Sequence, residues 1–344
     1  MVAALLQELE LQKDYLGGAE LTSVYFGGGT PSLLEIKELE QIFSKIQSLH
    51  RLSPTAEITL EANPDDLSPE LLRDLRNYTP VNRLSIGIQS FHDADLRWMN
   101  RAHTATHARA CLDAALDTGF DNLTIDLIYG APTTSDQHWQ ENLDIAFGLG
   151  IPHLSCYCLT VEEGTALGTF VRKGQARPVD EEQAARQMEY LMAATAAQGY
   201  EQYEISNFAR PGHYAQHNSN YWLGEPYLGL GPSAHSFNGQ SRQSNVANNA
   251  LYINSLAENK VPFEVENLSP EQRYNEYVLT SLRTSWGTEP TRMAAVQAER
   301  FEQLVQPYLQ AGTVERIGEA YRLTRAGRLF ADRIAMDLFM DVTE

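Results

Sequence analysis

Three consecutive glycines near the N-terminus are the first feature of this chain that could serve chemistry. The segment from Tyr25 to Pro31 reads as a strand that runs into Gly-Gly-Gly-Thr. Glycine has no side chain to hold a ligand away, so the backbone groups of Gly28, Gly29 and Thr30 would be open to contact. A tight strand-to-helix turn with Pro31 at the helix start would give the same pattern without a ligand.

Single polar residues stand at the ends of four further segments, namely Glu61, Gln89, Arg101 and Asp126. If the segments belong to a parallel sheet, their carboxyl ends lie at the same edge of the sheet, and these side chains line one common site there. A carboxylate in an apolar strand, as at Asp126, is costly to bury alone and therefore predicts a ligand amine or hydroxyl as partner. An Asp126–Arg101 ion pair is the structural alternative.

A histidine and two aromatic residues form a third cluster, in which His217 and Asn218 precede Tyr221 and Trp222. Neutral imidazole can ligate iron, and the two aromatic rings could lie against a flat macrocycle. A histidine packed and hydrogen-bonded in the core is the other interpretation that these residues allow. His213 lies four residues before His217, a zinc-site spacing on a helix, but no Glu base lies between them.

The three cysteines do not form a cluster-binding pattern. Cys111 lies in a predicted helix, whereas Cys156 and Cys158 are two apart on a predicted strand and face the same side. Thiols from such different elements cannot readily cap one face of an iron–sulfur cluster. So few cysteines in a long chain also indicate reduced thiols, not a disulfide framework.

Alternating strands and helices must position these residues. Three predicted helices lie between strand-like runs that are about 30 residues apart: one over Leu33–Gln47, one that begins after the N-cap Ser68, and one over His103–Asp117. This alternation is typical of parallel β/α units. The five predicted strands are 23–26, 57–60, 83–88, 123–128 and 153–158.

The pattern changes after residue 180. A long helix over Glu181–Gln198 leads to a strand-like run at 200–205 and then to a region rich in Gly, Asn, His and aromatic residues. The last part is helix-rich, and a predicted hairpin from Thr313 precedes a final helix, as in a winged-helix module. We therefore expect one domain over residues 1–240 and a second over 241–344.

Composition limits the classes of function. The 344 residues carry 26 basic and 45 acidic side chains, a net charge of −19, which would repel nucleic acid and anionic lipid. No apolar run is long enough to span a bilayer, and the first ten residues read as an amphipathic helix without the features of a signal peptide. We expect a cytoplasmic protein that binds no nucleic acid; the sequence leaves dimerisation open.

The series GGGTP, LEANP, IGIQSF, NRAH and IDLIYG, in this order, resembles radical SAM proteins related to oxygen-independent coproporphyrinogen III oxidase. The resemblance covers most of residues 1–240. It implies an α/β fold, a partial (β/α)6 barrel that holds S-adenosylmethionine (SAM), followed by a small α+β, winged-helix-like domain of the HemN type. By this resemblance, Gly28, Gly29 and Thr30 meet the methionine end of SAM, and its other polar groups contact Glu61, Gln89, Arg101 and Asp126.

The HNxxYW motif at 217–222 and the following GLGPSAHS at 229–236 are similar to the HemW-type heme chaperone branch. This resemblance implies that His217, Asn218, Tyr221 and Trp222 bind heme, with His217 as a candidate iron ligand. Heme would pass to acceptor proteins such as respiratory membrane enzymes, without turnover and without catalytic residues. The alternative is the oxidase itself, a radical SAM oxidoreductase of porphyrin biosynthesis.

Members of the family also carry a CxxxCxxC loop that binds a [4Fe–4S] cluster, and this sequence has no such loop. Met1 falls where the family has its first helix, so we expect the first barrel strand and the cluster loop to be missing. Without a cluster there is no electron source for reductive SAM cleavage, whereas the heme motif is unaffected.

Overall fold

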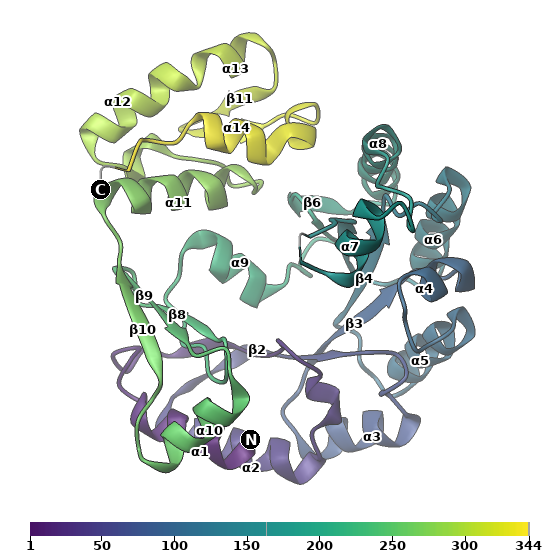
Figure 1. Cartoon of the computed structure of the whole chain (residues 1–344), viewed down its shortest axis with the longest axis vertical. Coiled ribbons are helices and arrows are strands. Elements are labelled where there is room, and N and C mark those ends of the chain that lie inside the picture. The colour runs from purple at the N-terminus through teal and green to yellow at the C-terminus, as the bar shows by residue number, and fades with distance from the viewer. Residues whose placement is uncertain (163, 343–344) are drawn as a thin grey trace.

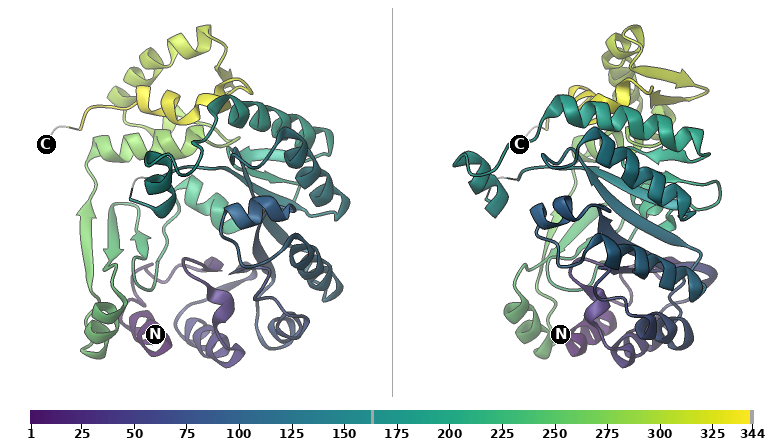
Figure 2. Two further views of the ribbon diagram at one scale, coloured as in Figure 1. Left: turned by 45° about the vertical axis from the view of Figure 1, so that its right-hand side comes forward. Right: turned by 90° about the vertical axis from the view of Figure 1, so that its right-hand side faces the viewer.

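The computed structural model describes residues 1–162 and 164–342 and contains a curved sheet of seven strands. The strand order is β1-β2-β3-β4-β5-β7-β6; β1 to β5 are parallel, and β7 is antiparallel to both of its neighbours. The bounds are β1 Leu21–Phe26, β2 Leu52–Ala62, β3 Arg83–Gln89, β4 Leu123–Tyr129, β5 His153–Cys158, β6 Glu201–Glu204 and β7 Asn207–Ala209. The sheet curls into an incomplete barrel (Figures 1 and 2).

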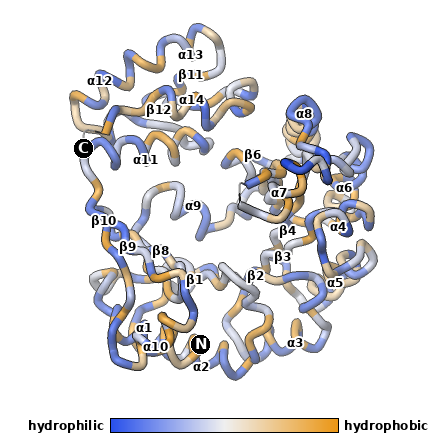
Figure 3. Tube along the Cα trace, viewed as in Figure 1, coloured by the Kyte–Doolittle hydropathy of each residue, from blue (hydrophilic) through white to orange (hydrophobic). Residues whose placement is uncertain are grey.

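Helices cover the convex face of this sheet (Figure 1). They are α2 Ile36–Leu49, α3 Pro69–Tyr78, α5 Ala105–Asp117, α6 Asp136–Gly148 and α8 Glu181–Ala197. The short helix α4 Asp93–Trp98 follows β3, and the short helix α7 Ala166–Arg172, which has no buried residue, projects away from the sheet (Figure 2). Local signals start them: Ser68 accepts a hydrogen bond from the Leu71 N–H at the start of α3, and Thr104 caps α5 in the same way. Apolar and polar segments alternate along the helices in Figure 3, as expected of helices with one buried face.

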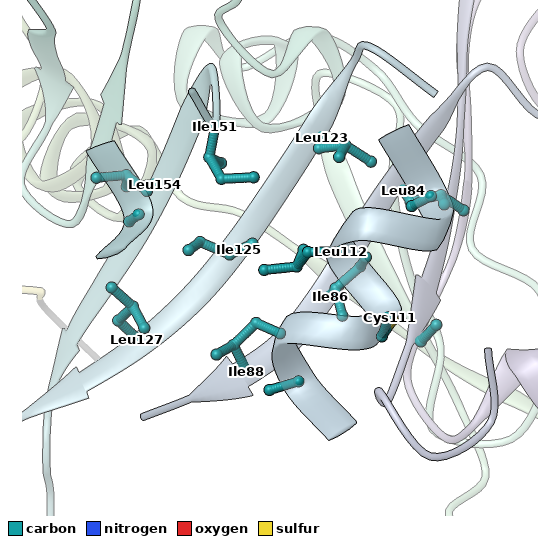
Figure 4. Packing of buried hydrophobic residues seen from close by; sticks show 14 of the residues in the cluster. Leu84, Ile86, Ile88, Cys111, Leu112, Leu123, Ile125, Leu127, Ile151 and Leu154 are labelled. Atoms are coloured by element: carbon teal, nitrogen blue, oxygen red, sulfur yellow. The ribbon is translucent and has the colours of Figure 1, made fainter. Parts of the chain in front are cut away.

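The two faces of the sheet differ because successive strand residues point to opposite sides. Outward-facing Leu84, Ile86, Ile125 and Leu127 are fully buried and pack with Leu112 of α5 (Figure 4). Each such side chain contributes roughly 1.5–3 kcal/mol by leaving water. The inward-facing set is mostly polar: Ser23, Tyr25, Glu57, Thr59, Glu61, Arg83, Ser85, Thr124, Asp126, His153, Ser155 and Tyr157.

Helix α9, Gln216–Leu223, lies on the concave side, across from the outer helices (Figure 1). Next come the three-stranded sheet β8 His235–Phe237, β9 Ser241–Asn245 and β10 Phe263–Asn267, together with α10 Asn249–Ala257. The fully buried carboxylate of Glu8 ties the first helix, α1 Val2–Leu11, to this part by accepting hydrogen bonds from the Gly231 N–H, Asn245 and Tyr252.

The C-terminal part has its own apolar core, built around Val278, Phe301, Val305 and Ala335. Its elements are α11 Pro270–Leu282, α12 Ala295–Leu304, α13 Gln306–Gln310, the antiparallel pair β11 Val314–Ile317 and β12 Ala320–Leu323, and α14 Ala331–Asp337. Among the residues that the structure describes, no helix combines the length and apolar character needed to cross a membrane.

The five predicted strands, the N-terminal helix and the C-terminal hairpin are confirmed, with ends extended by a few residues. The α/β class, with a partial barrel and a small α+β C-terminal part, is therefore confirmed. The domain boundary predicted between residues 240 and 241 stays a prediction. Strands β8 and β9, which lie on either side of it, pair with each other.

Candidate functional site

Helix α9, which carries the HNxxYW motif, is held by a carboxylate of the barrel. The N–H groups of Gln216 and His217 each donate to Glu57 at 3.0 Å, and the Gln216 side chain accepts from the Glu57 N–H at 3.2 Å. The helix has no cap from its own N-cap residue, Ala215. A negative charge at a helix N-terminus satisfies these unpaired donors and complements the helix dipole, so β2 fixes where α9 starts.

The charge of Glu57 is balanced inside the barrel. Arg83 lies 3.6 Å from it, and both side chains are almost fully buried. The guanidinium also donates to Asn122 and Thr124. From Thr124 the hydrogen bonds continue through the ring of His153 to the hydroxyl of Tyr203, at 3.2 and 2.8 Å.

We call Glu57, Arg83, Thr124, His153 and Tyr203 the floor network. Burial lowers the pKa of His153 well below its ordinary value, so this imidazole is neutral at physiological pH. Each polar group of the floor network has a partner within it or beside it.

Nearer the carboxyl ends of the strands, the inner face carries Tyr25, Glu61 and Asp126. The Tyr25 hydroxyl donates to Glu61 at 2.5 Å, and burial together with the Glu61 charge raises the pKa of this phenol. Burial and, secondly, the charge of Glu61 raise the pKa of Asp126 to about 7. Asp126 forms no ion pair with Arg101 in the described structure, although the charges of Arg101 and Arg83 lower its pKa from a distance.

The side chains of Tyr25 and Glu61 lie close against the backbone of the glycine loop after β1. A side chain on Gly27 would place its Cβ 2.6 Å from the Tyr25 ring and 2.8 Å from the Glu61 carboxyl carbon. Gly28 has a φ of +76°, which favours glycine, and Gly28, Gly29 and Thr30 are all exposed. The backbone here is thus open to a ligand.

Gln89 ends β3 in a conformation that non-glycine residues rarely adopt. Its φ is +65° and its side chain is buried. Such a conformation costs on the order of 1–3 kcal/mol and is found more often at functional sites. Arg101 lies beyond α4, half-buried, where it contributes its charge to the region of Asp126.

His217 joins α9 to the inner face of β1. Its Nδ1 lies 3.1 Å from the Ser23 hydroxyl, and its ring stacks on Tyr25 with centroids 4.6 Å apart and planes 19° apart. Burial lowers the pKa of this imidazole, so it is neutral at pH 7. Its Nε2 makes no hydrogen bond to any described residue, and this nitrogen has a free lone pair in the tautomer in which Nδ1–H donates to Ser23. We call Tyr25, Glu61, Asp126 and His217 the mouth cluster.

A cavity of about 410 Å³ opens beside His217. We call it the α9 cavity; it is lined by Tyr25, Tyr157, Glu204, Ser206, Asn207, His217, Asn218, Tyr221, Trp222 and Arg283. All four residues predicted for heme therefore line one space. Tyr25 and Tyr157 come from the barrel, whereas Arg283 follows α11 in the C-terminal part.

The residues predicted for SAM lie apart from the α9 cavity lining but adjoin it through Tyr25, which contacts both Glu61 and His217. Ser23, Tyr25, Glu57 and Arg283 were not predicted. The alternation of polar and apolar residues in β1 could have indicated Ser23 and Tyr25. His213 precedes the start of α9, so it does not share a helix face with His217, in agreement with the argument against a zinc site there.

The cysteines fit no cluster. Cys111 on α5 and Cys156 on β5 are buried in the outer core, where burial raises the pKa of Cys111 to about 12 and raises the pKa of Cys156 well above its ordinary value. Cys158 is exposed at the end of β5. Within residues 1–162 and 164–342, no three His, Cys, Asp or Glu side chains are arranged to hold a metal ion.

Comparisons with known proteins identify the family. The profile of the Radical SAM superfamily matches residues 4–146, and that of the HemN C-terminal domain matches residues 268–330. The heme chaperone HemW of Mycobacterium tuberculosis H37Rv is 36% identical over 338 residues, which is 97% of this chain and 85% of the relative. The Bacillus subtilis HemW is 32% identical over 337 residues, 96% and 89% of the two chains. This chain belongs to the HemW family.

A solved structure supports the fold of this HemW-family chain. Coproporphyrinogen III oxidase (HemN) of Escherichia coli superposes with a TM-score of 0.81 over 98% of this chain and 82% of that chain, at 22% identity. At this identity the match concerns the fold alone. The preference for the HemW branch over the oxidase rests on the sequence relatives, which span most of both chains.

Proposed function

We propose that this chain is a heme chaperone that binds heme in the α9 cavity and passes it to acceptor hemoproteins, such as respiratory enzymes, in the cytoplasm. The observation that carries the proposal is the free Nε2 of His217 beside a cavity with aromatic walls. The Ser23 hydroxyl holds the orientation of this neutral ring, and in the tautomer in which Nδ1–H donates to that hydroxyl, Nε2 carries the lone pair that iron ligation needs.

The aromatic walls suit a flat macrocycle. Tyr221 is 47% exposed and packs edge-on against Trp222, at 5.2 Å between centroids. Such rings supply large apolar contact area and keep a polar tip in water. Asn218, in the first turn of α9, adds an amide to the same lining. Binding and release need no bond to be broken in the macrocycle, so no catalytic residue is assigned.

We further propose that the mouth of the barrel accommodates SAM, as the family implies. The donor set fits: two carboxylates, Glu61 and Asp126, face inward below an open glycine loop at Gly28, Gly29 and Thr30, with Gln89 and Arg101 nearby. Carboxylates suit the amine and hydroxyl groups of SAM. The described cysteines do not fit a [4Fe–4S] cluster, so no reductive step is derived.

Hemin titration tests the heme proposal. Purified protein should shift the Soret band of hemin and saturate near one hemin per chain. His217→Ala should weaken binding at least about tenfold, because it removes the iron ligand. His107→Ala, which removes an exposed histidine on the outer helix α5, is the matched control and should bind as the parent does. Equal binding by both variants would contradict the proposal.

A further inference from the structure

Arg283 is the cation that the C-terminal part contributes to the α9 cavity. It caps the C-terminus of α11, and its side chain is 19% exposed. Its guanidinium carbon lies 5.5 Å from the centre of the Trp222 ring, within the range of a cation–π contact. Arg283 is thus placed at the edge of the aromatic surface proposed to hold the macrocycle.

Two carboxylates contact this guanidinium, and they differ in how firmly they are held. Nε donates to Glu204 at 3.1 Å, and one terminal nitrogen donates to Asp332. The Glu204 side chain is 1% exposed and also accepts from the Ser206 N–H at 2.9 Å and from Asn207 at 2.6 Å. Glu204 is therefore a fixed partner.

Asp332, in the first turn of α14, is the exchangeable partner. Its side chain is 72% exposed and makes no other hydrogen bond within the described residues. An ion pair with so exposed a partner is weak, and water replaces the lost contact at little cost. The other terminal nitrogen of Arg283 has no partner among the described residues.

We propose that Arg283 is the carboxylate-binding residue of the α9 cavity and that a propionate of heme takes the place of Asp332 on its guanidinium. The inference rests on the proposed heme function and adds the group that recognises the acidic edge of the macrocycle. A planar guanidinium offers two parallel donors that match a carboxylate, and Glu204 keeps its plane oriented. Asp332 holds this position when no ligand is present.

Two ligands that differ only in their carboxylates provide the test: hemin and hemin dimethyl ester, both in the same detergent. Arg283→Gln should weaken hemin binding roughly 10- to 100-fold, the loss expected for a charged hydrogen bond, and leave binding of the diester unchanged. Asp332→Asn should strengthen hemin binding several-fold, because it removes the competitor, and should not affect the diester. Arg283→Lys should retain part of the hemin affinity.

The outcomes separate this inference from the proposed function. An equal loss of hemin and diester in Arg283→Gln, or weaker hemin binding in Asp332→Asn, would overturn the carboxylate-binding role while heme binding itself stands. Failure of the parent protein to bind either ligand would instead overturn the heme proposal. Circular dichroism and thermal melting of each variant measure whether it is folded and how stable it is. If Arg283 serves only the fold, through its ion pair with Glu204, then Asp332→Asn leaves hemin affinity unchanged and the inference fails.

Discussion

The floor network and the mouth cluster occupy the same inner face of the same strands, yet they are built differently. In the floor network, Glu57 and Arg83 neutralise each other, and their remaining donors and acceptors are used by neighbouring side chains and by α9. In the mouth cluster, Asp126 has no ion-pair partner, and His217 leaves Nε2 unused in the described structure.

This difference separates groups that hold the fold from groups that are available to a ligand. Buried polar groups are normally satisfied, because an unsatisfied one costs free energy. A region beside a cavity that holds a carboxylate outside any ion pair and an imidazole nitrogen without a hydrogen bond is a candidate binding site. Variants of the two regions should therefore fail in different ways.

The largest effect is expected for Arg83→Leu. It leaves the Glu57 carboxylate buried without its cation, and breaking a buried pair in this way costs about 3–5 kcal/mol of unfolding free energy. Urea denaturation followed by circular dichroism measures it. Glu61→Gln, in the mouth cluster, is the control and should cost no more than about 1 kcal/mol. Similar losses of unfolding free energy in both variants would contradict the proposed difference between the floor network and the mouth cluster.

Glu57→Gln should have the next largest effect. The amide keeps the shape but loses the charge that pairs with Arg83 and complements the N-terminus of α9, so we expect a loss of about 1.5–3 kcal/mol. Because α9 carries His217, hemin affinity should fall as well. A destabilised variant with unchanged hemin affinity would show that Glu57 does not position the motif.

A smaller change, of opposite sign, is expected for Asp126→Asn. The pKa of Asp126 is raised from its ordinary value of 3.8 to about 7, so the folded state binds a proton that the unfolded state has lost. Its contribution to stability is full below about pH 4 and is lost as the pH rises through 7. The variant should therefore be more stable than the parent at pH 8, on the order of 1–2 kcal/mol after solvent screening, and nearly equal at pH 4. Unfolding free energies at the two pH values measure this, and a destabilised variant at pH 8 would contradict it.

Local patterns predicted much of the fold and part of the site. The alternation in strands such as Leu123–Tyr129 and the Ser68 cap are encoded by neighbouring residues, so these elements could be placed from the sequence. The contacts that organise the site are not local. Glu57 accepts a hydrogen bond from His217, which is 160 residues away in the sequence, and Glu204 accepts one from Arg283, which is 79 residues away. Only the packing of α9 and α11 onto the barrel brings these groups together.

Ligation of heme iron by His217 is the central claim, and chemical rescue tests it most directly. The hemin complex of the parent protein should show histidine ligation by electron paramagnetic resonance. His217→Ala should lose this signature and regain it when imidazole is added, because the vacated space beside Tyr25 can take a free ring. A His217→Ala complex that keeps the parent spectrum without imidazole would contradict the account.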